Sequence, residues 1–140
     1  MQVSGGCHCG EIAFEAELDP DRVGICHCTD CQALSGSAFR TLAIVAPEDF
    51  RLIRGQPREY VKTGDSGAGR IQAFCGTCGS ALYATNAEGP PTAFNLRAGI
   101  IAERAQLVPR FQCWTRSALT WLPRLPGAKL FPENPTIGTG

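Results

Sequence analysis

Seven of the eight cysteines stand in three short clusters, and this spacing indicates where chemistry can occur. Thiolates one or two positions apart converge easily on one ion, and zinc in proteins prefers sulfur and imidazole ligands. Disulfides between such close cysteines form only with strain and are typical of exported chains. The spacing therefore favours zinc over a disulfide framework. The clusters are Cys7-His8-Cys9, Cys26-His27-Cys28-Thr29-Asp30-Cys31 and Cys75-Gly76-Thr77-Cys78, and Cys113 stands apart from them.

The pair Cys75 and Cys78 has the spacing of a zinc knuckle, in which two cysteines bracket a tight turn and Gly79 follows where the backbone bends. A knuckle supplies two ligands, so a tetrahedral site needs two more. Either Cys7 and Cys9 or two of the three cysteines in the middle cluster could provide them. If the first pair does, the ion joins distant segments of the chain and contributes directly to folding.

Cys26, Cys28 and Cys31 then remain as three thiolates in one short loop. Three protein ligands with an open fourth position are typical of a catalytic zinc, where water or a substrate thiol binds with a lowered pKa. In the alternatives, Cys113 closes this site as a fourth thiolate, or one of the two histidines, His8 and His27, serves as a ligand. A lone cysteine in an apolar strand is more often a small buried hydrophobe. We therefore expect seven thiolates to hold two Zn²⁺ ions per chain.

The segments around these clusters are short strands separated by Gly, Pro and Asp. Apolar residues alternate with acids over 11–18, a period of two that predicts a half-buried strand. Helical periodicity is weak, with short helices predicted only over 29–34 and 117–122. These patterns predict a β-rich chain. The further predicted strands are 38–45, 50–53, 58–62, 70–74, 81–84, 92–98 and 110–115.

The length of 140 residues suits one domain, and nothing resembles an interdomain linker. We expect a single zinc-binding domain over 1–140, with its core at about 4–125. The C-terminal tail, 123–140, is rich in proline, which blocks regular ladders. We expect this tail to lie extended over the body and its last few residues to fray.

Charge and hydropathy restrict the classes of binding partner that the chain can have. The chain has 13 basic and 13 acidic side chains, and two dications with seven thiolates would bring its formal charge of zero to about −3. Nucleic-acid binding needs the opposite, a basic surface. No apolar run is long enough to span a bilayer, and the N-terminus lacks the features of a signal peptide. We expect a cytoplasmic protein without nucleic-acid or membrane partners.

The cysteine clusters also have characteristic neighbours. These form the motifs Gly6-Cys7-His8-Cys9-Gly10, Cys26-His27-Cys28-Thr29-Asp30-Cys31 running into Ser35-Gly36-Ser37-Ala38-Phe39, and Phe74-Cys75-Gly76-Thr77-Cys78-Gly79-Ser80-Ala81-Leu82. Over about residues 4–121, they resemble the glutathione-dependent formaldehyde-activating enzyme family, which also includes centromere protein V. The resemblance implies packed antiparallel sheets similar to those of a small Rab-exchange factor, with two zinc ions. It also implies a structural ion on Cys7, Cys9, Cys75 and Cys78 and an activity-linked ion on Cys26, Cys28 and Cys31.

The activity implied by the resemblance is condensation of glutathione with formaldehyde, which is classed with carbon–sulfur lyases. We expect a zinc-dependent enzyme of this type that acts on a small thiol or thiol–aldehyde adduct, with glutathione as partner. The alternative is a zinc-stabilised protein-interaction or scaffold module without catalysis. Family members often carry a histidine where this chain has Gln112. If that histidine moves a proton, its loss predicts slow formaldehyde condensation.

Other side chains are candidates for substrate contact or packing. Arg40, Arg70 and Arg97 lie on or near predicted strands and could bind a substrate carboxylate through their planar guanidinium groups. Arginines at such positions are more often solvated surface residues. Trp114 and Trp121 are expected to pack in the core or in a lid.

Overall fold

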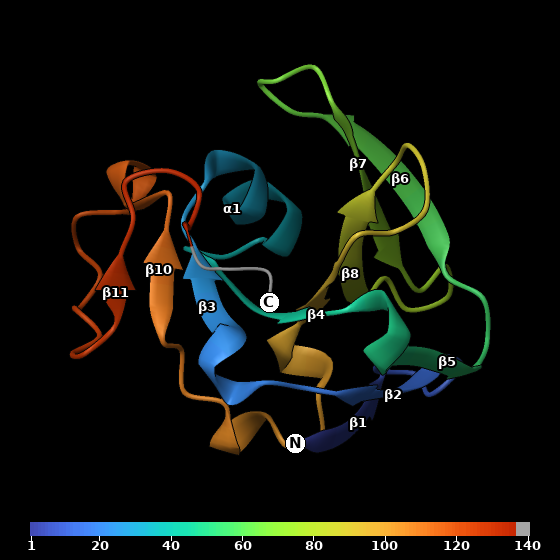
Figure 1. Cartoon of the computed structure of the whole chain (residues 1–140). Helices are drawn as coiled ribbons and strands as arrows, with labels where there is room; N and C mark the ends of the chain where they lie inside the picture. The colour runs from blue at the N-terminus through green and yellow to red at the C-terminus, as the bar shows by residue number, and fades with distance from the viewer. Residues whose placement is uncertain (137–140) are drawn as a thin grey trace.

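The predicted strands assemble into two sheets, with one short helix among the residues that the structure describes (Figure 1). The computed structural model describes residues 1–136. The strands are β1 (Gln2–Gly6), β2 (Ala13–Glu17), β3 (Val23–Cys26), β4 (Arg40–Val45), β5 (Phe50–Arg54), β6 (Arg58–Thr63), β7 (Gly69–Phe74), β8 (Ala81–Asn86), β9 (Phe94–Arg97), β10 (Phe111–Cys113) and β11 (Lys129–Leu130), and the helix is α1 (Thr29–Ser35). Single 3-10 turns occupy Pro20–Arg22, Pro47–Asp49, Ala98–Ile100, Arg104–Gln106 and Thr115–Ser117.

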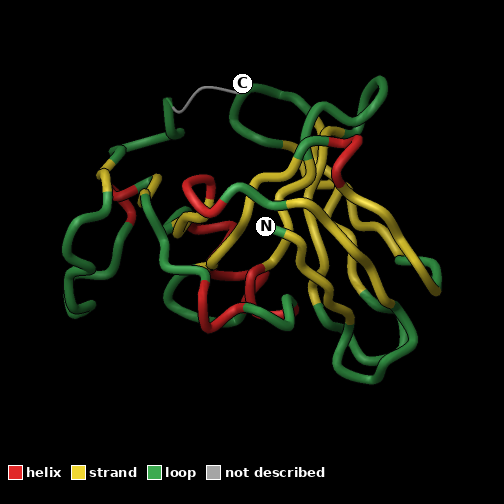
Figure 2. The backbone as a smooth tube through the Cα atoms, turned by 60° about the horizontal axis from the view of Figure 1, so that its bottom comes forward, coloured by secondary structure: helices red, strands yellow, loops and turns green. Residues whose placement is uncertain are grey.

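All eight strands predicted from the sequence are present, and the helix predicted over 29–34 is confirmed as α1. Figure 2 shows how the short helical turns stand between the longer strands. The sequence patterns missed β1, β3 and β11. Strand β1 ends in two glycines, β3 contains Gly24, and β11 has only two residues, so none of the three shows a clear alternation.

The prediction of a second helix over 117–122 is wrong. The backbone there forms a 3-10 turn and then irregular turns. The Ser117 N–H donates to the Trp114 carbonyl oxygen at 3.0 Å, and the Ala118 N–H donates to the Thr115 carbonyl oxygen at 3.1 Å, so the bonds are those of a single 3-10 turn. Ala118 is already extended, with φ of −62° and ψ of 137°, which ends the turn before a helix can form.

The small sheet has the order β1-β2-β5, and the large sheet has the order β11-β10-β3-β4-β9-β8-β7-β6. The pairing is antiparallel except at β10, which runs parallel to both β3 and β11. Parallel neighbours need long crossover connections, and residues 27–110 and 114–128 provide them. The tail thus joins the large sheet through β11, contrary to the expectation that its prolines keep it out of the ladders. The expected fraying concerns 137–140, which lie outside the described residues.

The two faces of the large sheet have different environments. In β4, Ala43 and Val45 point into the buried core between the two sheets, where Phe14 of β2 also packs. The alternate residues of β4, such as Leu42, lie on the opposite face because successive side chains of a strand point to opposite sides. Phe50 of β5 closes the core, with its ring centroid 5.7 Å from that of Phe14. The opposite face of the large sheet is free to line a site.

Within residues 1–136, no helix is both long and apolar enough to cross a membrane.

Candidate metal centres

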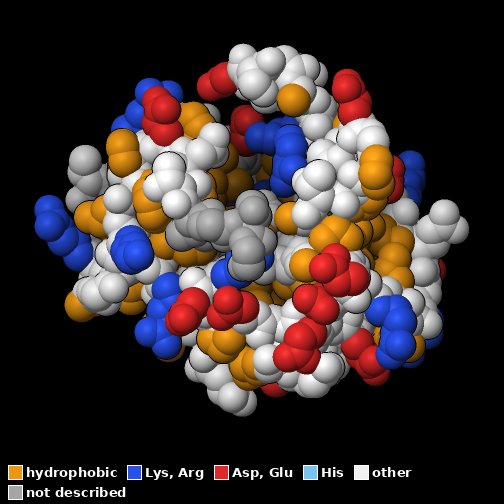
Figure 3. Space-filling model, in the orientation of Figure 1, with side chains coloured by type: hydrophobic (Ala, Val, Ile, Leu, Met, Phe, Trp, Pro, Cys, Tyr) orange, Lys and Arg blue, Asp and Glu red, His pale blue; other side chains and the backbone are white. Residues whose placement is uncertain are grey.

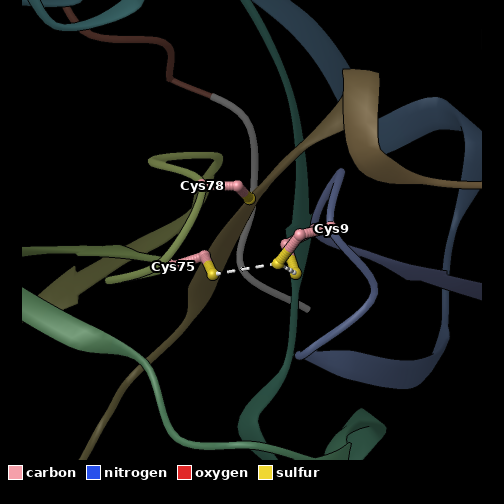
Figure 4. Close-up of side chains that lie close together, drawn as sticks. Cys9, Cys75 and Cys78 are labelled. Carbon is pink, nitrogen blue, oxygen red and sulfur yellow. Dashed lines mark hydrogen bonds between the residues drawn. The ribbon is translucent and has the colours of Figure 1, made fainter.

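The β1–β2 loop and the β7–β8 loop lie against each other, although they belong to different sheets. Figure 4 shows Cys9 on one loop opposite Cys75 on the other, with Cys78 beside them. The Cys9 Sγ atom lies 3.6 Å from that of Cys7 and 3.8 Å from that of Cys75. All four sulfur atoms lie within 4.8 Å of one another. These residues, Cys7, Cys9, Cys75 and Cys78, form the four-cysteine cluster.

A left-handed glycine follows the second cysteine in both loops of this cluster. Gly10 and Gly79 have φ angles of 84° and 80°, a left-handed conformation that glycine adopts without a steric penalty. The Gly10 N–H donates to the Cys7 carbonyl oxygen at 3.1 Å, and the Gly79 N–H donates to the Cys75 carbonyl oxygen at 2.8 Å. Each turn therefore folds back after its second cysteine and directs both sulfurs to one side.

The three-cysteine cluster, Cys26, Cys28 and Cys31, is built on a strand-to-helix turn. Cys26 is the last residue of β3, Cys28 is the N-cap of α1, and Cys31 lies in the first turn of α1. The Cys31 N–H donates to the Cys28 Sγ atom at 3.2 Å, as a serine or aspartate oxygen would accept at an N-cap. The three sulfur atoms lie within 4.8 Å of one another.

Hydrogen bonds among the thiols of the three-cysteine cluster shift their pKa values in opposite directions. Hydrogen bonds from Cys26 and Cys31 lower the pKa of Cys28 to about 2, with help from the Cys31 N–H and the charge of Lys62. Hydrogen bonding with Cys113 and Cys28 raises the pKa of Cys26, and hydrogen bonding with Cys26 and Cys28 raises that of Cys31. One thiolate therefore forms easily and the other two thiols keep their protons, unless a cation lies among them.

Both clusters fit a tetrahedral ion with sulfur ligands. With zinc–sulfur bonds of 2.3 Å, the sulfur atoms at two corners of a tetrahedron are about 3.8 Å apart. The distances from Cys9 to Cys7 and Cys75, 3.6 and 3.8 Å, match this separation. A disulfide bond would need about 2.05 Å, and all eight cysteines are free thiols. The clusters could therefore each hold a metal ion, with four ligands at one and three at the other.

The alternative ligands lie outside both clusters. His8 is exposed. His27 is buried, and its Nε2 atom donates to the Gln112 Oε1 atom at 2.7 Å, so its ring is held by β10. Cys113 pairs with Cys26 across the parallel β3–β10 ladder and is buried, but its sulfur is not one of the three that converge. The expectation of clusters made of cysteine alone agrees with this geometry.

The three-cysteine cluster opens into a cavity of about 720 Å³, a size in the range of small-molecule sites. The free face of the large sheet forms its floor. Residues of α1, the β6–β7 hairpin and the C-terminal segment form its walls. An ion pair of 2.7 Å between Lys62 and Asp30 joins the hairpin to α1 across one side. Figure 3 shows basic side chains in the hollow between α1 and this hairpin. The floor residues are Cys26, Leu42, Ile44, Arg70, Gln72, Ala84, Asn95, Arg97, Phe111 and Cys113.

The three candidate arginines gather around the three-cysteine cluster. Arg70 and Arg97 lie on the floor of the cavity. Arg40 lies opposite Cys26 in the β3–β4 ladder and lines a second cavity of about 280 Å³, which Arg97 also lines. Arg40 and Arg97 are only 5% and 8% exposed, so they are not the solvated arginines that such positions usually hold.

Gln72 and Asn95 also lie on the cavity floor, although no sequence motif points to them. Asn95 lies opposite Ala84, and Ala84 lies opposite Gln72, in neighbouring ladders. Their alternation along β7 and β9 was a usable signal, but it places them on a common face only once the strand order is known.

Gln112 is not part of the cavity lining, because Phe111 and Cys113 face the cavity and the residue between them points to the other side. Its side chain accepts the hydrogen bond from His27 instead. Gln112 therefore lies away from the cavity, and slow formaldehyde condensation caused by the missing histidine stays a prediction.

The two tryptophans behave differently. Trp114 lines the cavity, and its Nε1 atom donates to the Asn134 Oδ1 atom at 2.9 Å, which suits a wall or lid. Its φ of 53° is left-handed, a conformation that costs energy for a bulky residue. Trp121 is 70% exposed, so its expected place in the core or a lid is wrong.

Comparison with known proteins places this geometry in a family. Residues 2–117 match the family described as glutathione-dependent formaldehyde-activating enzyme, and this range covers most of the chain and both cysteine clusters. The chain belongs to this family. The match confirms the resemblance drawn from the three cysteine motifs. The glutathione-dependent formaldehyde-activating family is associated with zinc and acts with glutathione, which fits clusters made of thiols alone.

A solved structure shows the same fold. The crystal structure of a protein from Rhodobacter sphaeroides is 20% identical in sequence and has a TM-score of 0.55. The likeness covers 91% of this chain and 98% of that chain. It confirms the expected mainly β fold with packed sheets.

Proposed function

We propose that each cysteine cluster binds zinc and that the cavity beside the three-cysteine cluster binds a small thiol, such as glutathione or its aldehyde adduct. The protein then acts as a carbon–sulfur lyase that joins or separates the thiol and the aldehyde. One contrast supports this proposal: the four-cysteine cluster can complete a tetrahedron by itself, whereas the three-cysteine cluster leaves one corner facing a cavity of about 720 Å³.

The chain's own residues have separate roles around this corner. Cys26, Cys28 and Cys31 would hold the ion, which supplies Lewis acidity and lowers the pKa of a thiol bound to it. Leu42 and Phe111 form an apolar part of the floor and keep water from the thiol. The cavity walls position the thiol and the aldehyde together, which removes much of the entropic cost of joining them.

Cobalt substitution tests the proposal. Cobalt(II) in place of zinc absorbs visible light, and its spectrum reports the number of sulfur ligands. We expect glutathione to change the spectrum of one of the two ions, while the ion in the four-cysteine cluster stays unchanged as an internal control. Mixing glutathione with formaldehyde should then form the S-hydroxymethyl adduct, a hemithioacetal, faster with the zinc protein than without it, as followed by NMR.

Two variants assign the spectral change. Cys28→Ser should abolish it, because one ligand of the three-cysteine cluster is lost. Cys113→Ser should keep it, because this sulfur lies outside the cluster. A wild-type spectrum unaffected by any thiol, together with a Cys113→Ser spectrum that has lost one sulfur ligand, would show a closed structural site and would favour a scaffold role.

A further inference from the structure

The C-terminal residues 129–136 form part of one wall of the cavity beside the three-cysteine cluster, and we call them the strap. Glu133, Asn134 and Pro135 line this wall. At the start of the strap, β11 adds two residues to the outer edge of the large sheet, as Figure 1 shows. The strap lies beyond residues 2–117, so the family match implies nothing about its role. Because of its position, any movement of the strap changes how far the cavity is open.

The strap is attached by groups that lie near the surface. The Lys129 N–H donates to the Arg110 carbonyl oxygen at 3.0 Å, and the Phe131 N–H donates to the Gln112 carbonyl oxygen at 2.8 Å. Among the described residues from 114 onward, none is buried. A segment with little buried apolar surface opens locally at a small fraction of the free energy of global unfolding. The strap should therefore detach from β10 while the rest of the fold stays intact.

Trp114 connects the strap to the cavity wall in a strained backbone conformation. Its N–H donates to the Glu133 carbonyl oxygen at 2.8 Å, and its Nε1 atom donates to the Asn134 Oδ1 atom at 2.9 Å. Between residues 1 and 136, it is the one non-glycine residue with a left-handed φ. This conformation costs energy and persists only where the surroundings hold it. Since the strap supplies both acceptors, its departure should let the Trp114 backbone relax and the ring leave the wall.

The segment that leads to the strap can absorb this movement. Residues 118–128 form no helix or strand, and Gly127, with a φ of 79°, makes a turn directly before β11. Hinges are usually a few such residues in a loop or at the end of an element. The floor of the cavity belongs to the large sheet and does not depend on this segment. The strap can therefore move as a unit without rebuilding the floor.

Two side-chain contacts hold the strap in its closed position. On its outer side, Arg116 and Glu133 form an ion pair of 2.8 Å, in which the side chains are 56% and 59% exposed. The Arg116 guanidinium group also lies over the Trp114 ring, 5.0 Å from its centroid. On its inner side, the Phe131 ring packs near the Phe111 ring, with 6.4 Å between centroids. Exposed ion pairs contribute little free energy, so these contacts favour the closed position without locking it.

We propose that the strap opens and closes the cavity, so that a ligand enters and leaves while the strap is detached and is enclosed when it returns. Trp114 moves with the strap: its ring forms part of the wall in the closed state and leaves the wall in the open state. A ligand that contacts the closed wall shifts the equilibrium towards closure, because it binds that state better. The inference rests on the proposed function for its ligand, a small thiol, whereas the motion belongs to the strap itself.

Hydrogen–deuterium exchange of the full chain tests whether the strap detaches alone. The amides of Trp114, Thr115 and Phe131 each donate to a bond that detachment breaks, to the carbonyl oxygens of Glu133, Phe131 and Gln112 respectively. One local opening releases all three, so they should exchange together and roughly a hundredfold or more faster than the amides of β3 and β4. Exchange as slow as in β3 and β4 would overturn the proposal.

Alkylation by N-ethylmaleimide measures access to the cavity without any thiol ligand. Glu133→Arg removes the ion pair and places like charges together, which should favour the open strap. Cys28, which lines the cavity, should then react roughly two- to fivefold faster, the range expected for loss of an exposed ion pair. Mass spectrometry of the cysteine peptides gives the rates. Cys9 and Cys78 are exposed in the other cluster, so their unchanged rates serve as an internal control.

Further variants separate strap opening from a change of charge. Asn134→Ala changes no charge but frees the indole, so it should also speed alkylation of the cavity cysteines. Arg116→Glu combined with Glu133→Arg restores a pair of opposite charges and should return the rate towards that of the wild type. Glu15→Arg breaks the exposed pair with Arg51 on the small sheet and is the matched control, with no effect on the cavity. If neither Glu133→Arg nor Asn134→Ala speeds alkylation, the proposal is wrong.

Stopped-flow binding of glutathione to the cobalt-loaded protein shows whether the strap controls the ligand. Glu133→Arg and Asn134→Ala should each raise the association and dissociation rate constants together, by about the factor found for alkylation. Unchanged rate constants would show a mobile wall that does not gate the ligand, and would overturn the proposal. A cobalt spectrum that glutathione leaves unaffected, with faster alkylation in both variants, would instead overturn the proposed thiol site and support the strap as a gate.

Discussion

At the scale of single residues, the cysteines of the two clusters have different surroundings. In the four-cysteine cluster, Cys7 and Cys75 are buried and belong to the core between the sheets. The other two, Cys9 and Cys78, are exposed. In the three-cysteine cluster, Cys26 is buried, Cys28 and Cys31 are half-buried, and all three line the cavity. We therefore expect loss of a core ligand such as Cys75 to affect the folded state, and loss of a cavity ligand such as Cys28 to affect binding.

Cys75→Ser and Cys28→Ser should separate these two effects. The first would remove a ligand from the ion proposed to join the two sheets, and structural zinc contributes on the order of 10 kcal/mol to folding. We expect loss of soluble protein or a severe drop in Tm. The second should lower the free energy of unfolding far less, because serine still caps α1, while abolishing the thiol response. Metal content, Tm and the cobalt spectrum check both. Equal losses of stability in the two variants would contradict the assignment of roles.

At the scale of elements, β3 depends on close contact with β10. Gly24 lies opposite Phe111 in the parallel ladder, and a Cβ atom added to Gly24 would come within 2.2 Å of the Phe111 ring. The same ring forms part of the cavity floor, and the centroid of the Phe131 ring lies 6.4 Å from its own. The glycine therefore lets an aromatic ring lie flat across β3, next to the strand end that carries Cys26.

Gly24→Ala should destabilise the protein, because the ring must move to admit the added methyl group. Overpacking of this kind costs typically 1–3 kcal/mol, and movement of Phe111 should also weaken thiol binding. Gly99→Ala is the matched control, since a Cβ atom there would meet nothing within 4 Å and its backbone is not left-handed. Chemical denaturation should show a change within about 0.5 kcal/mol for the control. An equally small change at Gly24 would show that β10 is not packed as described.

At the scale of the whole molecule, the four-cysteine cluster connects the two sheets, whereas the three-cysteine cluster lies within one end of the large sheet. The first adds a link between elements that otherwise touch only through apolar packing and a few hydrogen bonds. One of these is the bond from the His8 N–H to the Ser80 Oγ atom at 3.0 Å. Metal at this cluster should therefore control the stability of the whole fold.

Stepwise chelation should produce two phases. An ion in the three-cysteine cluster would have fewer ligands and, as proposed, an open side, so it should leave first, with loss of thiol binding and little change in Tm. Removal of the second ion should then lower Tm sharply, because the folding energy that it supplies is lost. Zinc release measured with a coloured indicator, alongside thermal unfolding, follows both phases. Release of both ions in one step together with unfolding would show that the clusters are not independent.

The sequence by itself determined the grouping of the cysteines and most of the strands. Cysteines at close spacing with glycine after the knuckle are local features, and the turns at Gly10 and Gly79 form from local backbone geometry. Alternation of apolar residues likewise depends only on the period of two within each strand. For these reasons the two cysteine clusters, eight strands and α1 could be predicted, and the family match agrees with them.

The tertiary structure alone decided which side chains share the cavity. Arg97 and Cys26 come together because β4 lies between β9 and β3, and strand order depends on long-range packing rather than on local pattern. The parallel course of β10 and the pairing of the tail through β11 arise in the same way, from crossovers that no short motif specifies. Burial also depends on distant segments, so the sequence could name Arg40 as a candidate for carboxylate binding, but only the fold shows that its side chain is buried.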